Sequence, residues 1–560
     1  IPEDLAELRT LCQIVDYMKS KAPAASAVAP HASASQQSAS IETVGAKNLS
    51  PVPVSDLQPV VLAIVAEKTG YPVEMLELDM DMEADLGIDS IKRVEILSAV
   101  QERVPGLPEF NPDVLAEFRT LQQIVNAMGH TSGAQISEAH TSGFNTRAPI
   151  NAAPSATVAI KKLSAPDRLS ITLPKASLCL INDDGGAAMV PLISHLQKRG
   201  WEIAVLQWPQ SLSARTTKLP SGVKAVAVAD ASETALQAAL DSVAQTIGNI
   251  AAVIHLQPVR AVNGIEFPDA ARDLLRLVFL QAKHLKVALN EAATRGGRAA
   301  FITVSRIDGQ LGWRGSNGDL LQAGLFGLTK TLHHEWPAVF CRAIDADPGF
   351  DGEALATQLV AELLDVDSRL PEVGISANER VTLVVEKTNS YVQAPGKTIT
   401  KDSVFLVSGG AKGVTTACVA ALARQHGGKY ILLGRSALLA AEPSWCAGIS
   451  SDAELKKRAM AELTAKGEKP TPVKVQQFMR PILSSREISQ ALHDIRNAGG
   501  VAEYVAGDVT DAAGIKAKLA AVTAKLGKIT GIVHGAGVLA DRLIEQKTVK
   551  DFDAVYGTKI

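Results

Sequence analysis

Between residues 51 and 129, apolar residues recur at the spacing of one face of a helix. The clearest run follows Ser55 and ends at Gly70-Tyr71-Pro72, which is a helix stop. Three such apolar faces can be recognised: Leu57, Val60, Val61, Ile64 and Val65; Ile91, Val94 and Leu97; and Leu121, Ile124, Val125 and Met128. This pattern predicts a small all-α bundle.

From about residue 166 the pattern changes to short apolar runs that alternate with helical stretches. The first series of strand-like runs is 177–181, 203–206, 251–255 and 300–304, and the second is 404–408, 430–433, 502–505 and 531–534. Strands that alternate with helices are typical of parallel sheets covered on both faces. The sequence therefore predicts two Rossmann-like α/β units side by side, 166–400 and 401–560.

An internal repeat and two low-complexity segments set the remaining boundaries. Residues 2–18 repeat as 112–128, and both copies carry a capping box, Thr10 with Gln13 and Thr120 with Gln123. Residues 1–19 are thus predicted to be the end of one module and 51–129 a whole second copy. Ala, Ser, Pro and Gly dominate 20–50 and 130–165, which we expect to be linkers because they offer little apolar surface to bury.

Composition narrows the class of protein. A length of 560 residues requires several cores, and a net charge of -3 argues against a nucleic-acid partner. The five cysteines form no CxxC pair, which favours reduced thiols in a cytoplasmic protein without a zinc or disulfide framework. No apolar run is long enough to span a membrane. We expect no metal site.

The first candidate site is the turn Gly87-Ile88-Asp89-Ser90, which precedes a helix. A phosphodiester at Ser90 Oγ would lie near the positive end of the helix dipole. The acidic run 77–85 before it would steer basic partner surfaces. The alternative is a plain N-cap pair beside a solvated acidic face.

The second candidate site follows the strand 404–407. Glycines there allow a sharp turn and a close approach to a pyrophosphate, although a glycine cluster alone is a weak signal. The candidate residues at this turn are Gly409, Gly410, Ala411, Lys412, Gly413 and Val414. At the end of the next strand come Arg435 and Ser436, and an arginine here suits the 2′-phosphate of NADPH. The third strand ends at Asp508 and Val509 and the fourth at His534, Gly535 and Ala536.

The stretch Leu86-Gly87-Ile88-Asp89-Ser90-Ile91-Lys92-Arg93-Val94-Glu95 resembles the acyl carrier protein family. This run of residues is most similar to the sequences of the tandem carrier domains of bacterial polyunsaturated fatty acid synthases. The resemblance implies a four-helix bundle and a 4′-phosphopantetheine arm on Ser90, which a phosphopantetheinyl transferase would attach.

Residues 401–560 resemble short-chain dehydrogenases, in the form found as ketoreductase domains of polyketide and fatty acid synthases. The resemblance implies that Asp508 and Val509 flank the adenine of NADPH and that the turn at His534 lies beside the cofactor. Lys559 matches the catalytic lysine, although a plain helix lysine is an equal alternative. Two departures are Thr415, where the family often has glycine, and a long insertion at 437–500.

Residues 166–400 are similar to the structural subdomain of such ketoreductases, which binds no cofactor. Asp183-Asp184-Gly185-Gly186 occupies the first turn, where carboxylates would repel a pyrophosphate. The run His333-His334-Glu335 suggests a metal site, but adjacent helix positions point in different directions.

These resemblances imply that the chain carries acyl groups on phosphopantetheine and reduces 3-oxoacyl thioesters to 3-hydroxyacyl thioesters. The implied partners are ketosynthase, acyltransferase, dehydratase and enoyl reductase domains of a homo-oligomeric multienzyme. The family places its serine and tyrosine in residues that this sequence lacks, so we expect an incomplete ketoreductase. Alternatives are a modular polyketide synthase fragment, or a carrier scaffold with a non-catalytic reductase half.

Overall fold

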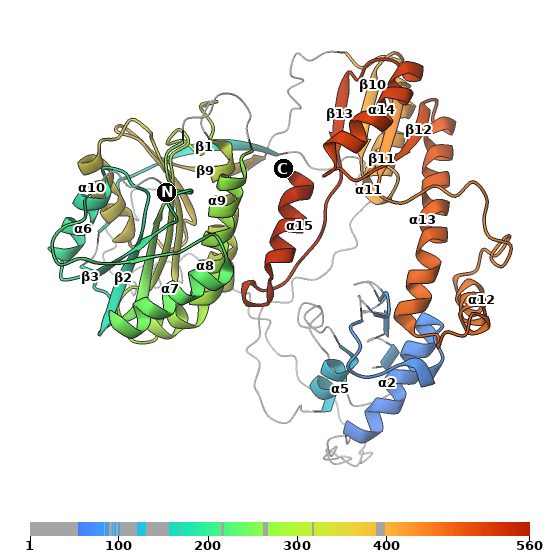
Figure 1. Ribbon diagram of the computed structural model, residues 1–560, viewed down its shortest axis with the longest axis horizontal. Coiled ribbons are helices and arrows are strands. Elements are labelled where there is room, and N and C mark those ends of the chain that lie inside the picture. Colours follow the sequence, from blue (N-terminus) through green and yellow to red (C-terminus); the bar gives the residue numbers. More distant parts are fainter. Residues whose placement is uncertain are drawn as a thin grey trace, which may run out of the picture. The chain divides into compact units, whose positions relative to one another are not determined.

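The computed structural model describes residues 54–82, 85–88, 92, 95–96, 99–100, 103, 120–129, 156–168, 170–213, 218–260, 267–315, 319–387 and 398–560 (Figure 1). The chain divides into two compact units, residues 1–136 and 137–560. No helix within the described ranges is long and apolar enough to cross a membrane.

The first unit contains helices α2 (Val54–Thr69) and α5 (Leu121–Gly129), with a short 3-10 helix η1 (Val73–Met75) after α2. The helix α2 ends where predicted, because Gly70 adopts a φ of 77° and its N–H closes the last turn on Ala66 O at 2.8 Å. The helices contact each other through their apolar faces, and Ile64, Val65 and Ile124 are fully buried or nearly so.

The predicted capping box before α5 is confirmed. The Gln123 N–H donates to Thr120 Oγ1 at 3.3 Å, and the Thr120 N–H donates to Gln123 Oε1 at 3.2 Å. The matching pair in the first copy, and the predicted face of Ile91, Val94 and Leu97, lie outside the described residues. The count of four helices therefore stays a prediction.

The second unit begins with a nine-stranded sheet in the order β1-β9-β8-β7-β6-β5-β2-β3-β4. Its strands are β1 (Ala156–Leu163), β2 (Ser177–Asp183), β3 (Glu202–Gln207), β4 (Lys224–Ala227), β5 (Asn249–Leu256), β6 (Ala300–Ser305), β7 (Phe340–Ala346), β8 (Glu372–Ile375) and β9 (Arg380–Lys387). The strands β2 to β8 run parallel, whereas β9 is antiparallel to both β8 and β1.

Helices cover both faces of this sheet (Figure 1). One face packs on α6 (Met189–Gln197) and α10 (Gly352–Leu363); the other packs on α7 (Glu233–Thr246), α8 (Asp269–Ala293) and α9 (Gly324–Glu335), which follows the 3-10 helix η2 (Leu320–Ala323). The four strands predicted for this region are confirmed as β2, β3, β5 and β6. The linker prediction is wrong for residues 156–163, because they pair along their whole length with β9.

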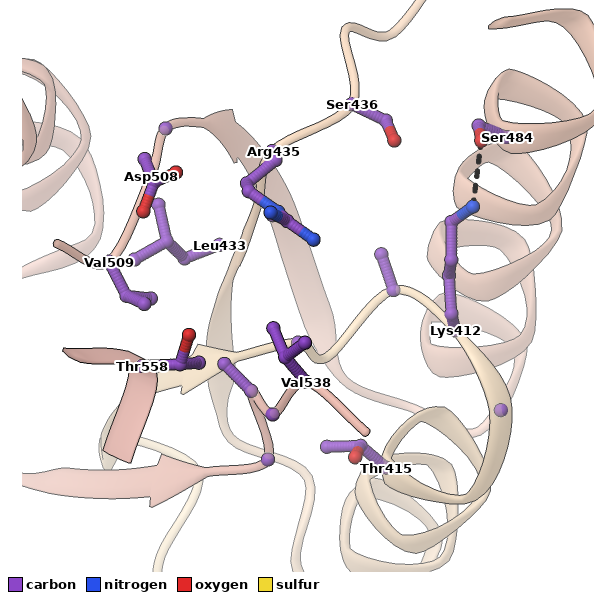
Figure 2. A pocket seen from close by; sticks show the side chains of 18 of the residues that line it. Lys412, Thr415, Leu433, Arg435, Ser436, Ser484, Asp508, Val509, Val538 and Thr558 are labelled. Atoms are coloured by element: carbon purple, nitrogen blue, oxygen red, sulfur yellow. Dashed lines mark hydrogen bonds between the residues drawn. The ribbon is translucent and has the colours of Figure 1, made fainter. Parts of the chain in front are cut away.

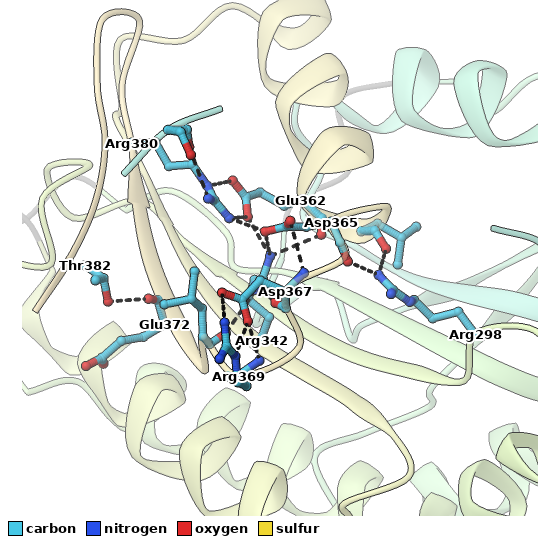
Figure 3. Close-up of polar contacts among 12 residues, drawn as sticks. Arg298, Arg342, Glu362, Asp365, Asp367, Arg369, Glu372, Arg380 and Thr382 are labelled. Atoms are coloured by element: carbon cyan, nitrogen blue, oxygen red, sulfur yellow. Dashed lines mark hydrogen bonds and ion pairs between the residues drawn. The ribbon is translucent and has the colours of Figure 1, made fainter. Parts of the chain in front are cut away.

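A buried ion network ties the antiparallel edge of this sheet to α10 (Figure 3). Arg342 of β7 is fully buried, and its Nη1 lies 2.9 Å from both Glu362 Oε2 and Asp365 Oδ2. Arg380 of β9 pairs with the same two carboxylates. Each buried charge thus has opposite charges and hydrogen bonds around it, which offsets the cost of leaving water.

The rest of the second unit carries a four-stranded parallel sheet in the order β12-β11-β10-β13. Its strands are β10 (Val404–Ser408), β11 (Lys429–Gly434), β12 (Val501–Ala506) and β13 (Gly531–His534), as predicted. One face packs on α11 (Gly413–His426) and α13 (Pro472–Asn497), and the other on α14 (Ala512–Leu526).

The prediction of an insertion over 437–500 is wrong for its second half. The helix α13 connects β11 to β12 as an ordinary crossover, and its residues Ile488, Ala491 and Ile495 are buried in the core with β10 and β11. Only the stretch before α13, which contains α12 (Asp452–Ala465), is additional, and α12 packs against α13.

The chain ends in η3 (Ile544–Gln546) and α15 (Val549–Lys559), which join the two sheets of the unit. Ile544 is buried in the core beneath α8, and Phe552 packs against Phe279 of α8 with the rings tilted by 33° and their centroids 5.4 Å apart. Lys286 of α8 also pairs with Glu545 at 2.6 Å. The other side of α15 is left to face the four-stranded sheet.

Candidate functional site

Ser90 and Asp89 lie outside the described residues, but the turn that leads to them is described through Ile88. Leu86 and Ile88 are buried on either side of exposed Gly87, whose φ is 66°. The Ile88 N–H donates to Met82 O at 2.7 Å, which folds the loop back onto the core. Ile88, two residues before the predicted attachment residue Ser90, is therefore anchored.

The acidic run before this turn splits into two groups. Glu77 and Asp79 are exposed, whereas Asp81 and Asp85 are half-buried. Asp85 Oδ2 accepts a hydrogen bond from the Asp81 N–H at 2.8 Å, so this carboxylate holds the loop. Glu77 and Asp79 are the described acids that remain open to a partner.

In the second unit, a cavity of about 880 Å³ opens at the carboxyl ends of β10, β11, β12 and β13. This is the edge where parallel α/β sheets bind ligands. The lining includes Gly409, Ala411, Lys412 and Gly413 from the turn between β10 and α11. Gly413 and Thr415 of the first turn of α11 also line the cavity, and the first N–H groups of a helix have no partner within the helix, so the turn can hold a phosphate group.

Gly409 is required by the close approach of two turns. Its φ is 65°, and a Cβ at this position would lie 2.9 Å from Ala536 N and from Gly535 C and O. The Gly409 N–H donates to Leu433 O at 2.8 Å, which links the turn to β11 as well. A side chain here would push apart the strands that form the cavity.

At the end of β11, Arg435 and Ser436 line the cavity as predicted (Figure 2). Tyr504 of β12 donates its phenol O–H to Ser436 O at 2.6 Å, which fixes the backbone after Arg435. Burial raises the pKa of Tyr504, so this phenol stays protonated as the donor. The Arg435 guanidinium extends into the cavity from an exposed position.

Asp508 and Val509 also line the cavity as predicted, after β12. Thr510 donates to Asp508 Oδ1 from its N–H at 2.9 Å and from its hydroxyl at 2.8 Å. These two hydrogen bonds, together with the charge of Arg435, hold the pKa of Asp508 below its usual value. The carboxylate is therefore ionised at neutral pH.

At the end of β13, Gly535, Ala536 and Gly537 line the cavity. Thr415 occupies the place where the family often has glycine, and it lines the cavity too. A Cβ at Gly535 would lie 2.4 Å from Thr415 Oγ1, so the threonine is accommodated by a glycine on the opposing turn. The threonine at position 415 is thus matched by the absence of a side chain at Gly535.

Three predicted residues lie outside the cavity lining. Gly410 packs inward, where a Cβ would lie 2.5 Å from Val407 Cγ1. Val414 is 80 % exposed on the first turn of α11 and faces solvent. His534 points back to β10, where its Nδ1 lies 2.7 Å from Ser408 Oγ. These three were predicted as cofactor contacts from their place in the motif, and that role stays a prediction.

Lys559 is an exposed residue in the last turn of α15, close to the cavity. A Cβ at Gly537 would lie 3.4 Å from Lys559 Nζ, so the ammonium group borders the turn after β13. Asp553, Ala554 and Thr558 of the same helix line the cavity itself. Of the two tyrosines that could be mistaken for proton donors, Tyr504 donates its hydroxyl to Ser436 O, and Tyr556, whose hydroxyl is buried, stacks on Phe552 and does not line the cavity.

Sequence reasoning missed the contribution of α13. Arg480, Ser484 and Ile488 line the cavity from this helix. The available signal was their spacing of four residues, which places all three on one helix face. Because the segment was interpreted as an insertion, that spacing was not connected with the site.

The corresponding turn of the nine-stranded sheet is closed by its own carboxylates. The Gly185 N–H donates to Asp183 Oδ1 at 2.8 Å, and the Gly186 N–H donates to Asp184 Oδ1 at 2.9 Å.

In the described part of the chain, no group of three or more His, Cys, Asp or Glu side chains is placed to hold a metal ion. Glu335, which belongs to the run His333-His334-Glu335 considered above, accepts a hydrogen bond from the Ile544 N–H at 3.0 Å.

Comparison with protein families matches two parts of the chain. Residues 59–128 match the family described as "Phosphopantetheine attachment site", and residues 403–560 match the "KR domain" family. The chain is also 36% identical, over 593 aligned residues, to a polyunsaturated fatty acid synthase subunit of Thraustochytrium sp.. That alignment covers 99% of this chain and 20% of the relative, so the chain spans about a fifth of the relative's length.

Two solved structures resemble parts of this chain at low sequence identity. A multidomain structure described as "Adenylation, ketoreductase, and pseudo Asub" of a keto acid-selecting module superposes with a TM-score of 0.50 and 12% identity, over 90% of this chain and 39% of that one. An N-terminal ketoreductase from the macrolactin assembly line gives a TM-score of 0.49 and 15% identity, over 72% of this chain and 69% of that one.

Proposed function

We propose that this chain holds acyl groups on a phosphopantetheine arm and supplies the NADPH-binding part of a ketoreductase that reduces them, as the acyl carrier and ketoreductase region of a synthase of the polyunsaturated fatty acid type. The substrate would be a 3-oxoacyl thioester and the product a 3-hydroxyacyl thioester. The observation that carries the proposal is the cavity at the ends of β10 to β13, lined by a glycine turn and by Arg435, in one chain with a phosphopantetheine attachment domain.

Ser90 is the proposed attachment residue. It follows the anchored Ile88 at the start of a predicted helix, so a phosphodiester on its Oγ would be stabilised by the helix N-terminus. Incubation of the chain with coenzyme A and a phosphopantetheinyl transferase should add one arm, measured as a shift of the intact mass. Ser90→Ala should abolish the shift, and Ser55→Ala should keep it. A modified Ser90→Ala chain would contradict the assignment.

NADPH is the proposed reductant, and the residues present fit it. The turn of Gly409 and Gly413 together with the α11 N-terminus would hold the diphosphate, and Arg435 would hold the 2′-phosphate. When bound, the reduced nicotinamide supplies a hydride to the C3 carbonyl of the substrate. The new alkoxide at C3 then takes up a proton, and Lys559, beside Gly537, would lower the pKa of the group that donates it.

Cofactor choice gives the sharpest test of this half. Arg435→Asp should reverse the preference for NADPH over NADH, since a charge-assisted contact becomes a repulsion. A loss of more than about tenfold in NADPH affinity is expected, because hydrogen bonds to charged groups are worth roughly 1.5–3 kcal/mol. Fluorescence titration of the reduced cofactor measures both affinities. Equal binding of NADPH and NADH by the unmodified chain would contradict the proposed role of Arg435.

The nine-stranded sheet is proposed to be a structural partner. Its first turn engages the N–H groups of Gly185 and Gly186 with Asp183 and Asp184, so those donors are not open to a diphosphate. It supports α15 through α8, and α15 in turn lines the cavity. Fluorescence titration with NADPH and NADH also separates the proposed reductase from a carrier scaffold with an inert reductase half, because the scaffold would bind neither NADPH nor NADH.

We also propose that the carrier exchanges substrates with the other domains of such a synthase, namely ketosynthase, acyltransferase, dehydratase and enoyl reductase domains, in a homo-oligomeric cytoplasmic assembly. The exposed Glu77 and Asp79 support this by offering a negative surface in the segment that precedes Ser90 in the sequence. Reversing both charges should slow modification by the transferase and increase its KM, with little change in the folding of the carrier.

A further inference from the structure

The cavity has a wall that belongs to no recognised cofactor motif. Arg480, Ser484 and Ile488 of α13 face it at intervals of four residues. Ser484 and Ile488 are buried, whereas Arg480 is exposed. The helix therefore presents an apolar base, a hydroxyl and a cation along one side of the site.

The basic residues around the cavity differ in how far their charge is already compensated. Lys412 Nζ donates to Ser484 Oγ at 2.8 Å and lies 2.7 Å from Glu487 Oε2, so α13 offsets its charge (Figure 2). The positive charge of Arg435 is partly offset by the ionised carboxylate of Asp508, whose pKa it lowers. Arg480, by contrast, has no hydrogen bond or ion pair with any residue in the described ranges.

The position of Arg435 fixes where an additional cation would be useful. The 2′-phosphate of the cofactor belongs at the end of the second strand, and near neutral pH a phosphate monoester carries more negative charge than one guanidinium balances. Figure 2 shows the Arg435 side chain pointing across the cavity toward the helix that carries Ser484. A phosphate bound by Arg435 would thus lie between β11 and α13.

We propose that Arg480 is a second specificity-determining residue, which binds the 2′-phosphate of the cofactor from α13 opposite Arg435. The inference rests on the proposed use of NADPH and deepens it. It assigns to α13 a role in cofactor choice in addition to its packing on the sheet. Lys412, held by Ser484 and Glu487, then positions the glycine turn more than it neutralises the phosphate.

The test uses the full chain and two probes that differ only in the 2′-phosphate, adenosine 2′,5′-bisphosphate and adenosine 5′-monophosphate. Arg480→Gln removes the cation and keeps a polar side chain that can still donate a hydrogen bond. Lys474→Gln is the matched control, because Lys474 lies on the same helix but does not line the cavity. Calorimetric titration at two salt concentrations measures the affinities, and circular dichroism checks that each variant is folded.

Arg480→Gln should weaken binding of the bisphosphate by about tenfold and leave the monophosphate within about twofold, as expected for one charge-assisted contact. It should also reduce the salt dependence of bisphosphate binding, whereas Lys474→Gln should change neither. Equal losses for both probes, or an unchanged bisphosphate affinity while Arg435→Gln loses it, would overturn the inference and leave the proposed function standing. Absence of binding of either probe to the unmodified chain would instead contradict the proposed function.

Discussion

Gly409→Ala tests whether the cavity depends on the close approach of the turns after β10 and β13. The new Cβ would lie 2.9 Å from the backbone of Gly535 and Ala536. That backbone has little room to withdraw, since the Gly535 N–H donates to Ser408 O at 2.9 Å and the Ala536 N–H donates to Ser408 Oγ at 3.3 Å. The substitution therefore strains the site at its centre.

Two costs can be separated. Placing an L-residue at a φ of 65° costs about 1–2 kcal/mol, and forcing the two turns apart costs about 1–3 kcal/mol more. Gly413→Ala is the matched control, because its φ is 54° but a Cβ there meets nothing within 4 Å. It should show only the first cost. The difference between the variants, about 2 kcal/mol, then measures the contact between the turns.

Denaturant unfolding of the full chain and NADPH fluorescence titration would report the two effects. Gly409→Ala should lower the unfolding midpoint more than Gly413→Ala. If the full cost of about 3 kcal/mol falls on the cofactor-binding conformation, NADPH affinity should drop by roughly a hundredfold. A Gly413→Ala variant that is as damaged as Gly409→Ala would refute the reasoning, because backbone conformation alone would then explain both.

Two further predictions concern buried charges in the nine-stranded half. Arg342→Met should lower the free energy of unfolding by about 3–5 kcal/mol, because Glu362 loses a buried partner. Arg369→Ala, which removes an exposed ion pair, should lower it by less than about 1 kcal/mol, and equal effects of the two variants in a urea titration would contradict this. Burial raises the pKa of Asp345 to about 6, so its contribution to stability is present at acidic pH and is lost as pH rises through about 6. Asp345→Asn should therefore flatten the pH dependence of unfolding between about pH 4 and 7, and an unchanged profile would contradict the assignment.

Much of the fold follows from local patterns. The strands β10, β11, β12 and β13 were predicted within one or two residues, because buried parallel strands are short apolar runs between glycine-rich turns. The capping box at Thr120 was also predicted, since it depends on residues three apart. The strand β1 was missed because its residues Ala156–Leu163 are largely exposed and are polar in part, and only pairing with β9 makes them a strand.

For the site, local sequence was enough to identify the turns that meet a cofactor, because the carboxyl ends of parallel strands share one edge of a sheet. Which side chains face that edge depends on tertiary packing. That packing turns Val414 to solvent and His534 back to Ser408, and it brings Ser484 to Lys412 across 72 residues of chain. Such a contact depends on how α13 packs on β10 and β11 through Ile488 and its neighbours, and spacing along the sequence carries no information about the packing of distant elements.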